Sequence, residues 1–214
     1  AVLQFLGVPI LGFPVLSFPL TDDRKSGWLP PTVVPLDSRN GFTLAVPYYW
    51  NIAPNRDATL VPTLLTKRGV GLDSEFRYLE PGHSGRARLN WLPQDRLAGR
   101  ARHAWELEAD GQWPADLRYR ARLRQVSDDA YWQDFPRALP DSLVQRLLTQ
   151  ELGVERELTT GIGQLTSYAR VQHWQVLQTG SGTDLILAPY QRSPQLGLRL
   201  QSARGLGLRA QVET

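Results

Sequence analysis

The sequence predicts an all-β chain that forms part of an antiparallel transmembrane β-barrel. From residue 26 onward, apolar and polar residues alternate in one segment after another, with almost no helical pattern. Segments of roughly ten residues with one apolar and one charged face are typical of outer-membrane strands. Long and short connections also occur in the order expected of such a barrel. A soluble β-sandwich is the alternative, but its outer face more often carries serine and threonine.

The opening stretch of the chain, residues 1–20, is apolar enough to suggest a membrane helix. Pro9, Pro14 and Pro19 argue against this, because each proline would interrupt the hydrogen bonding of a helix. Their regular spacing fits short extended segments joined by bends. We therefore expect strands at the N-terminal end as well.

The chain divides into three predicted regions. We expect residues 1–21 to be the end of a periplasmic β domain and residues 22–27 to form a charged linker. Residues 28–214 should form about eleven strands of an incomplete barrel. The sequence shows no signal peptide, and it stops inside an alternating segment. We interpret it as an internal part of a longer protein.

Prolines interrupt the first three strands of the predicted barrel. The first strand contains Pro30 and Pro31, the second contains Pro47 and the third contains Pro62. Proline lacks the N–H group that a strand donates to its neighbour, so it is normally confined to sheet edges, strand ends and bulges. Neighbouring strands that each contain one predict a sheet that separates easily there. A symmetric turn at residues 51–55 would place Pro47 opposite Pro62.

The later strands each have an apolar face and a charged face. In residues 117–124, two leucines, a tyrosine and an alanine alternate with four arginines. We expect the apolar face to meet lipid and the charged face to line the barrel lumen. The predicted lumen-facing residues are Asp73, Glu75, Arg77, Glu106, Glu108, Arg118, Arg120, Arg122 and Arg124.

The two strands that flank Trp113 and Pro114 suggest a register that matches acids with arginines. The predicted pairs are Asp110 with Arg118, Glu108 with Arg120, and Glu106 with Arg122. Opposite charges directly across a strand pair contribute about 0.2–1 kcal/mol each. Such charges would keep the lumen wet. A role in guiding phosphate groups is less favoured, because the acids neutralise much of the basic ladder.

Connection lengths predict the orientation of the strands. Long connections are expected near residues 127–142 and 179–193, on one side of the sheet. Short connections are expected at residues 51–55, 81–84, 111–113, 159–163 and 204–205. Outer-membrane barrels keep their periplasmic turns short and their extracellular loops long. The first strand should therefore run outward from the periplasm.

The sequence offers little for catalysis or metal binding. The chain contains no cysteine, and its three histidines lie in different segments without metal-ligand spacing. Asp128, Asp129 and Asp134 surround Tyr131 and Trp132 and could bind Ca²⁺, but solvated loop acids are the favoured interpretation. We predict no enzymatic activity, no cofactor, no metal and no nucleic-acid partner.

The proline-containing region resembles the LptD family of outer-membrane lipopolysaccharide-assembly proteins. The resemblance is carried by the run PYYWNIAPN at residues 47–55, and then by Asp57-Ala58-Thr59, Pro62, Arg68-Gly69 and residues 75–79. The resemblance also includes Arg24-Lys25-Ser26-Gly27, Val126-Ser127-Asp128-Asp129, Tyr131 and Asp134-Phe135, and, with less specificity, Trp174-Gln175. One departure is a short connection at residues 93–97, where a long extracellular loop is expected.

The resemblance implies transport rather than catalysis. A periplasmic β-jellyroll, of which residues 1–21 would be the end, would receive lipopolysaccharide from the bridge protein LptA. The lipid would leave between the first and last barrel strands into the outer leaflet of the Gram-negative outer membrane, among its lipids. The sugar part would cross a lumen that is plugged by the lipoprotein LptE. Pro30, Pro31, Pro47 and Pro62 would weaken this lateral gate. The alternative is a general porin or an autotransporter-type barrel, which should seal its seam with unbroken strands.

Overall fold

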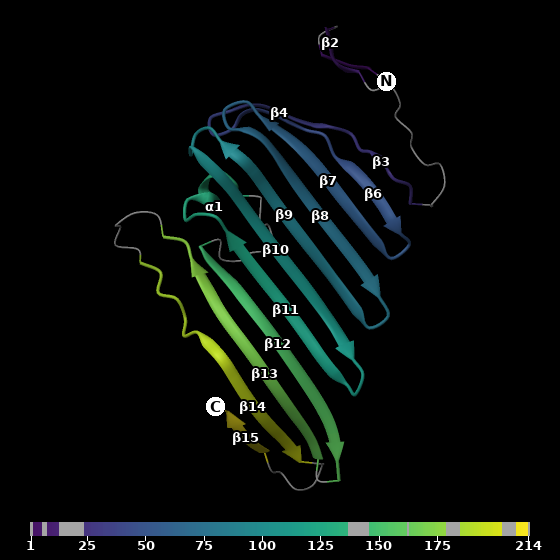
Figure 1. Ribbon diagram of the computed structural model, residues 1–214, viewed down its shortest axis with the longest axis vertical. Helices are drawn as coiled ribbons and strands as arrows, with labels where there is room; N and C mark the ends of the chain where they lie inside the picture. The colour runs from purple at the N-terminus through teal and green to yellow at the C-terminus, as the bar shows by residue number, and fades with distance from the viewer. Residues whose placement is uncertain are drawn as a thin grey trace.

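Strands account for nearly all of the secondary structure. The computed structural model describes residues 2–5, 8–12, 24–136, 146–161, 163–178, 185–202 and 209–213. β1 (Val2–Phe5) and β2 (Val8–Gly12) form a two-stranded antiparallel sheet of their own. All the other described strands join one 13-stranded antiparallel sheet (Figure 1).

The large sheet follows chain order across most of its width, which is the arrangement that short hairpin connections produce. Its strands are β3 (Gly27–Trp28), β4 (Thr32–Asp37), β5 (Gly41–Ala45), β6 (Tyr48–Ala53), β7 (Arg56–Leu65), β8 (Gly69–Glu80), β9 (His83–Asp95), β10 (Arg100–Trp113), β11 (Leu117–Val126), β12 (Leu147–Thr160), β13 (Gly163–Val176), β14 (Arg192–Ser202) and β15 (Arg209–Glu213).

Two rows of the sheet are interrupted strands. β5 and β6 both pair with β7, so they are two parts of one strand. β4 pairs with β5 and β3 pairs with β6, so these two also form one row. When each interrupted strand is counted once, the thirteen described segments make eleven rows. This agrees with the expected number.

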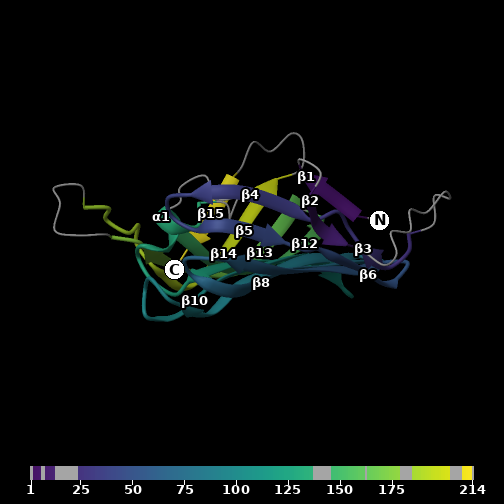
Figure 2. The ribbon, with the colours of Figure 1, turned by 90° about the horizontal axis from the view of Figure 1, so that it is seen from above.

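The sheet is curved, and its connections divide between two edges. Figure 2 shows β8 and β10 at the bottom of the curve and β4, β14 and β15 above them. The connections that follow β11 and β13 leave the same edge, as the sequence predicted. The β11–β12 connection contains α1 (Tyr131–Asp134), the one helix among the described residues. No helix in the described part of the chain has the length and apolar character needed to cross a membrane.

The strand register puts all nine predicted lumen-facing residues on one face of the sheet. Glu75, Arg88, Glu106 and Arg124 are successive partners across four strands, and the other six predicted positions follow by alternation. The hydroxyl group of Tyr131 donates a hydrogen bond to Asn90 on this same face. The charged face is therefore the concave face, on which α1 lies (Figure 2).

Large apolar side chains are exposed on the opposite, convex face. An exposed apolar surface that extends over many strands is typical of a surface that meets lipid or a partner. These exposed residues include Trp50, Val70, Phe76, Leu89, Trp91, Leu152, Leu196 and Leu198.

The register predicted for β10 and β11 is wrong by two residues. The turn consists of three residues, 114–116, and is centred on Ala115 rather than on Pro114. Ala115 and Asp116 both have positive φ angles, of 66° and 57°. A slip of two residues keeps every side chain on its face, so acids still meet arginines. The observed pairs are Asp110 with Arg120, Glu108 with Arg122, and Glu106 with Arg124.

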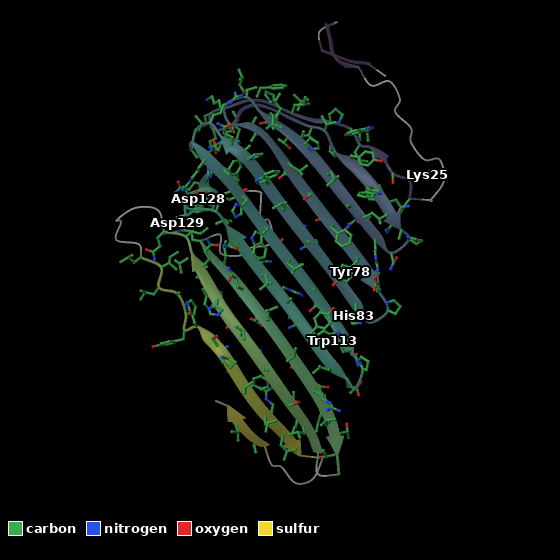
Figure 3. The ribbon with its side chains drawn as sticks, in the orientation of Figure 1. Lys25, Tyr78, His83, Trp113, Asp128 and Asp129 are labelled. Atoms are coloured by element: carbon green, nitrogen blue, oxygen red, sulfur yellow. The ribbon has the colours of Figure 1, made fainter. Side chains whose placement is uncertain are left out.

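Aromatic rings cover glycines on the convex face near the short turns. Tyr119 lies across Gly111 of the neighbouring strand, and its ring stacks with Trp113 at a centroid distance of 4.7 Å. The Tyr119 hydroxyl group is 3.1 Å from His83 Nδ1. Figure 3 shows His83 and Trp113 close together at this edge. Glycine permits this arrangement, because a Cβ atom at residue 111 would lie 2.5 Å from the tyrosine ring.

Replacing Gly111 with alanine should destabilise the sheet by about 1–3 kcal/mol, because the added carbon must displace Tyr119 and His83. The matched control is Gly153→Ala on β12, where the nearest atom to a new Cβ is 3.9 Å away. The control should be neutral or slightly stabilising. Urea unfolding of the two variants in detergent would measure the difference. Equal stabilities would show that Tyr119 does not need the space above Gly111.

Candidate functional site

The two interrupted strands at the edge of the sheet break side by side. Residues 29–31 separate β3 from β4, and Val46 and Pro47 separate β5 from β6. The two breaks are in direct contact, since the Leu29 N–H donates to the Pro47 carbonyl oxygen at 2.9 Å. Pro30 and Pro31 therefore lie at the same level of the sheet as Pro47. We call this region of residues 29–31, 46–47 and 62 the proline break.

Pro62 reaches the same level from inside a continuous strand, β7. The Val46 N–H donates to the Pro62 carbonyl oxygen at 3.1 Å. Val46 is thus opposite Pro62, and the predicted pairing of Pro47 with Pro62 is wrong. The cause is a bulge in β6 between Asn51 and Ala53, which shifts the register by one residue.

The one-residue shift changes which hydrogen bonds the prolines remove. In an antiparallel sheet, successive residues direct their backbone groups to opposite neighbours. Val46 faces β7, where Pro62 cannot return a hydrogen bond to the Val46 carbonyl group. Pro47 faces the row of β3 and β4, and it cannot donate there. The interrupted strand of β5 and β6 forms one ladder with β7 and another with the row of β3 and β4. Each of these two ladders therefore lacks one hydrogen-bond donor at the same level.

The chain that enters the sheet is fastened below the proline break. The Asn51 N–H donates to Ser26 Oγ at 2.8 Å, and the Asn51 side-chain amide donates to the Arg24 carbonyl oxygen at 2.6 Å. Arg24 also lies 3.5 Å from the Asp57 carboxylate, which accepts two hydrogen bonds from Arg77. The turn end of the β6–β7 hairpin is thus held, while the level above it lacks one hydrogen-bond donor in each of two ladders.

The charged face forms a continuous ladder of ion pairs. Basic and acidic strands alternate across it: β9 and β11 contribute arginines, whereas β10 and β12 contribute carboxylates. Two of the close contacts join Glu75 to Arg88 at 2.7 Å and Glu106 to Arg124 at 2.6 Å. Other pairs are Asp57–Arg77, Arg86–Glu108, Arg122–Asp110, Arg120–Asp110, Arg118–Glu157 and Arg170–Glu151.

A buried cluster that the sequence did not reveal lies at the long-loop edge. Arg102 contacts Asp128 through two hydrogen bonds of 2.9 and 2.8 Å, Asp134 at 2.5 Å and Asp95 at 3.3 Å. Arg68 contacts Asp95 at 2.6 Å and Asp134 at 2.7 Å. We call these two arginines and three aspartates the α1 anchor. All but one of these contacts join residues 26 or more positions apart along the chain, which hides the pairing from any local pattern.

The anchor replaces the favoured interpretation of Asp128 and Asp134 as solvated loop acids. Asp128 is buried and Asp134 is half-buried, and arginines bind both carboxylates. Asp129 is exposed (Figure 3). In the residues that the structure describes, no group of three or more histidines, cysteines or acids is arranged to hold a metal ion. Burial by itself would raise the pKa of Asp128, but hydrogen bonds from Arg102 and Ser127 lower it below its ordinary value.

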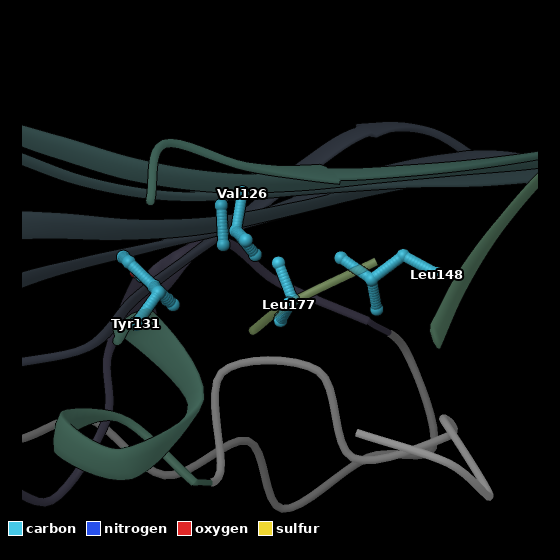
Figure 4. Close-up of a cluster of buried hydrophobic side chains, with 5 residues drawn as sticks. Val126, Tyr131, Leu148 and Leu177 are labelled. Atoms are coloured by element: carbon cyan, nitrogen blue, oxygen red, sulfur yellow. The ribbon is translucent and has the colours of Figure 1, made fainter. Parts of the chain in front are cut away.

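An apolar core continues from the anchor beneath α1. Tyr131 packs with Val126, Leu148 and Leu177, as Figure 4 shows, and Trp132 and Phe135 border this cluster. The guanidinium groups of Arg68 and Arg102 lie 5.1 and 5.2 Å from the centre of the Phe135 ring. Burial raises the pKa of Tyr131 well above the ordinary range of a tyrosine. The helix is thus fixed to the concave face by both charge and packing.

Two family models match the chain in consecutive parts. One, described as LptD protein, matches residues 1–91. The other, described as LPS transport system D, matches residues 100–214, which is more than half of the chain. The chain belongs to the LptD family. The family resemblance seen in the sequence is therefore confirmed.

Relatives within the LptD family support this assignment. LPS-assembly proteins LptD from Albidiferax ferrireducens, an Acidovorax species and a Polaromonas species are 45%, 44% and 47% identical to the chain, respectively. The matches cover 93%, 96% and 91% of the chain, but 25%, 26% and 24% of the relatives. The chain spans about a quarter of the length of the curated relatives it matches.

Residues that carry the resemblance to LptD meet in space. Arg24 and Ser26 contact Asn51 and Asp57, although the two groups come from separate parts of the resemblance. Arg68, Asp128 and Asp134 join the α1 anchor in the same way. The LptD-like residues therefore mark two structural contacts in addition to the proline break.

Proposed function

We propose that this chain contributes the first strands of an outer-membrane barrel that assembles lipopolysaccharide into the outer leaflet. The proline break is the observation that carries the proposal, because it weakens two successive ladders at one edge of the sheet. The matched relatives are named LPS-assembly proteins, which supports lipopolysaccharide as the substrate.

The physical argument concerns hydrogen bonding in lipid. A strand seam inside the membrane stays closed because separated backbone groups would find no water to bond with. Each hydrogen bond that is absent from the closed seam lowers the free energy needed to open the seam by about 0.5–1.5 kcal/mol. The proline break lowers the free energy needed to separate the strands at Val46, whereas the contacts of Asn51 hold the adjacent turn. A lipid could then leave sideways while most of the sheet remains intact.

Membership in the LptD family supports a proposal for the rest of the assembly. Residues 1–21 would end a periplasmic β-jellyroll that receives lipopolysaccharide from LptA, residues 22–27 would link it to the barrel, and residues 28–214 would belong to the barrel itself. The charged concave face would line a lumen that holds the plug lipoprotein LptE and passes the sugar part. The exposed apolar face would contact the outer-membrane lipids. Transport of this kind requires no catalytic residue.

A photo-crosslinking amino acid at residue 46 tests the lateral exit. We expect it to capture lipopolysaccharide during delivery by the intact protein into vesicles that initially contain none. The control position is residue 152, which is exposed on the apolar face of β12, far from the proline break. Cross-links at residue 46 should appear before those at residue 152. Simultaneous cross-links at both positions, or none at residue 46, would rule out exit through the break.

A further inference from the structure

A small cavity lies on the charged concave face between β13 and β14. Its volume is about 220 Å³, and its lining includes Arg170, Arg192 and Arg199 with a single acid, Glu155. Tyr168 also lines it and crosses Gly197 of the neighbouring strand, where any Cβ atom would collide with its ring. The cavity is thus formed by strands of the sheet and not by loops.

A bulge directs Arg192 into this cavity. Arg170 pairs with Gln195, but two residues later Gln172 pairs with Arg192, three residues earlier on β14. The extra residue reverses the alternation, so Arg192 lies on the same face as Arg170 and Arg199. Bulges often re-aim a side chain in this way. Strict alternation would have put Arg192 on the apolar face.

The cavity differs from the rest of the charged face in its balance of charge. A neighbouring cavity of about 290 Å³ is lined by three arginines and three carboxylates, a balanced set that includes Arg118, Arg120, Asp110 and Glu151. The smaller cavity has three arginines and one carboxylate. Among the described residues, Arg192 and Arg199 form no ion pair, whereas Arg170 is 3.7 Å from Glu151. Of the two cavities, the smaller one therefore has the surplus of positive charge.

We infer that this cavity binds the phosphate group of a phosphorylated sugar. Guanidinium groups are planar donors that match phosphate oxygens, and three of them converge here on a space of suitable polarity. Tyr168, Glu155 and Arg170 line both cavities, so a sugar attached to the phosphate would lie over the larger one. The inference rests on the proposed function in one respect, because a phosphorylated sugar reaches this face only if the concave face is the passage.

Calorimetric titration of the intact protein in detergent with glucosamine 6-phosphate tests the site. We expect the double variant Arg192→Gln/Arg199→Gln to bind this sugar phosphate at least about tenfold more weakly than the parent, because charge-assisted hydrogen bonds are lost. The matched control is Arg77→Gln/Arg86→Gln, which removes the same charge from arginines that have acidic partners on the same face and line neither cavity. The control should change the affinity less than about twofold.

Several outcomes would overturn the inference. These are no binding by the parent, equal loss in the two double variants, and inorganic phosphate binding as tightly as glucosamine 6-phosphate. Delivery of lipopolysaccharide by the parent, measured in the same preparation, separates this inference from the proposed function. A parent that delivers the lipid but does not bind the sugar phosphate refutes only the phosphate site. A parent that binds the sugar phosphate but delivers no lipid supports the site and refutes the proposed function.

Discussion

Replacing Arg102 with leucine should lower the free energy of unfolding by roughly 3–5 kcal/mol. The side chain is 2% exposed, and it is the partner shared by Asp95, Asp128 and Asp134. Without it, the carboxylates of Asp95 and Asp128 remain buried with too few positive charges. Arg68 would still contact Asp95 and Asp134, but Asp128 would lose its closest positively charged partner. The loss should therefore detach α1 from the concave face.

Urea unfolding in detergent would measure the effect of Arg102→Leu. The control is Arg120→Leu, because Arg120 forms an ion pair with Asp110 at 3.1 Å but its side chain is 68% exposed. Solvent screens that pair, so the control should change the free energy of unfolding by less than about 1 kcal/mol. A similar small loss in both variants would show that burial of the α1 anchor does not strengthen it.

The two faces of the sheet could be predicted from the sequence, but the register could not. Alternation assigned Glu106 and Arg124 to one face, and this assignment is insensitive to a slip of two residues. The three-residue turn at residues 114–116, with two left-handed residues, decided the register. Neither Ala115 nor Asp116 is a glycine, so no sequence signal marked their conformation.

The candidate site shows the same limit. The four prolines predicted a weak place in the sheet, and the structure brings all of them to one level. A single bulged residue near Asn51 changed which ladder each proline affects. The α1 anchor was missed because its partners approach only after the strands curve and the long connection folds onto the concave face. Long-range contacts of this kind leave no periodic signal in a sequence.

Replacing Pro47 and Pro62 with alanine should strengthen the proline break and slow lipopolysaccharide delivery. Each alanine supplies an N–H group for one ladder, which is worth about 0.5–1.5 kcal/mol. Alanine also gives the unfolded chain more freedom, at a cost to stability of about 0.4–1 kcal/mol for each position. Global stability should therefore change little. The local effect should appear as slower amide hydrogen exchange at Leu29 and Val46, whose N–H groups bond across the break.

A proline in a distant strand provides the matched control. Pro93 is exposed in β9, close to a register shift but several strands away from the proline break. Pro93→Ala should leave both amide exchange at Val46 and lipid delivery unchanged. This control separates the general effect of removing a strand proline from the effect of its position.

The most direct test of the central claim is the rate of lipopolysaccharide delivery by the Pro47→Ala/Pro62→Ala variant. The rate should be measured in reconstituted vesicles at matched protein levels, with amide exchange followed in the same preparation. We expect delivery to be about tenfold slower, since closing the two ladders adds hydrogen bonds that must break before the lipid can leave. Delivery at the parent rate, in a variant whose Leu29 and Val46 amides exchange more slowly, would contradict a gate at the proline break.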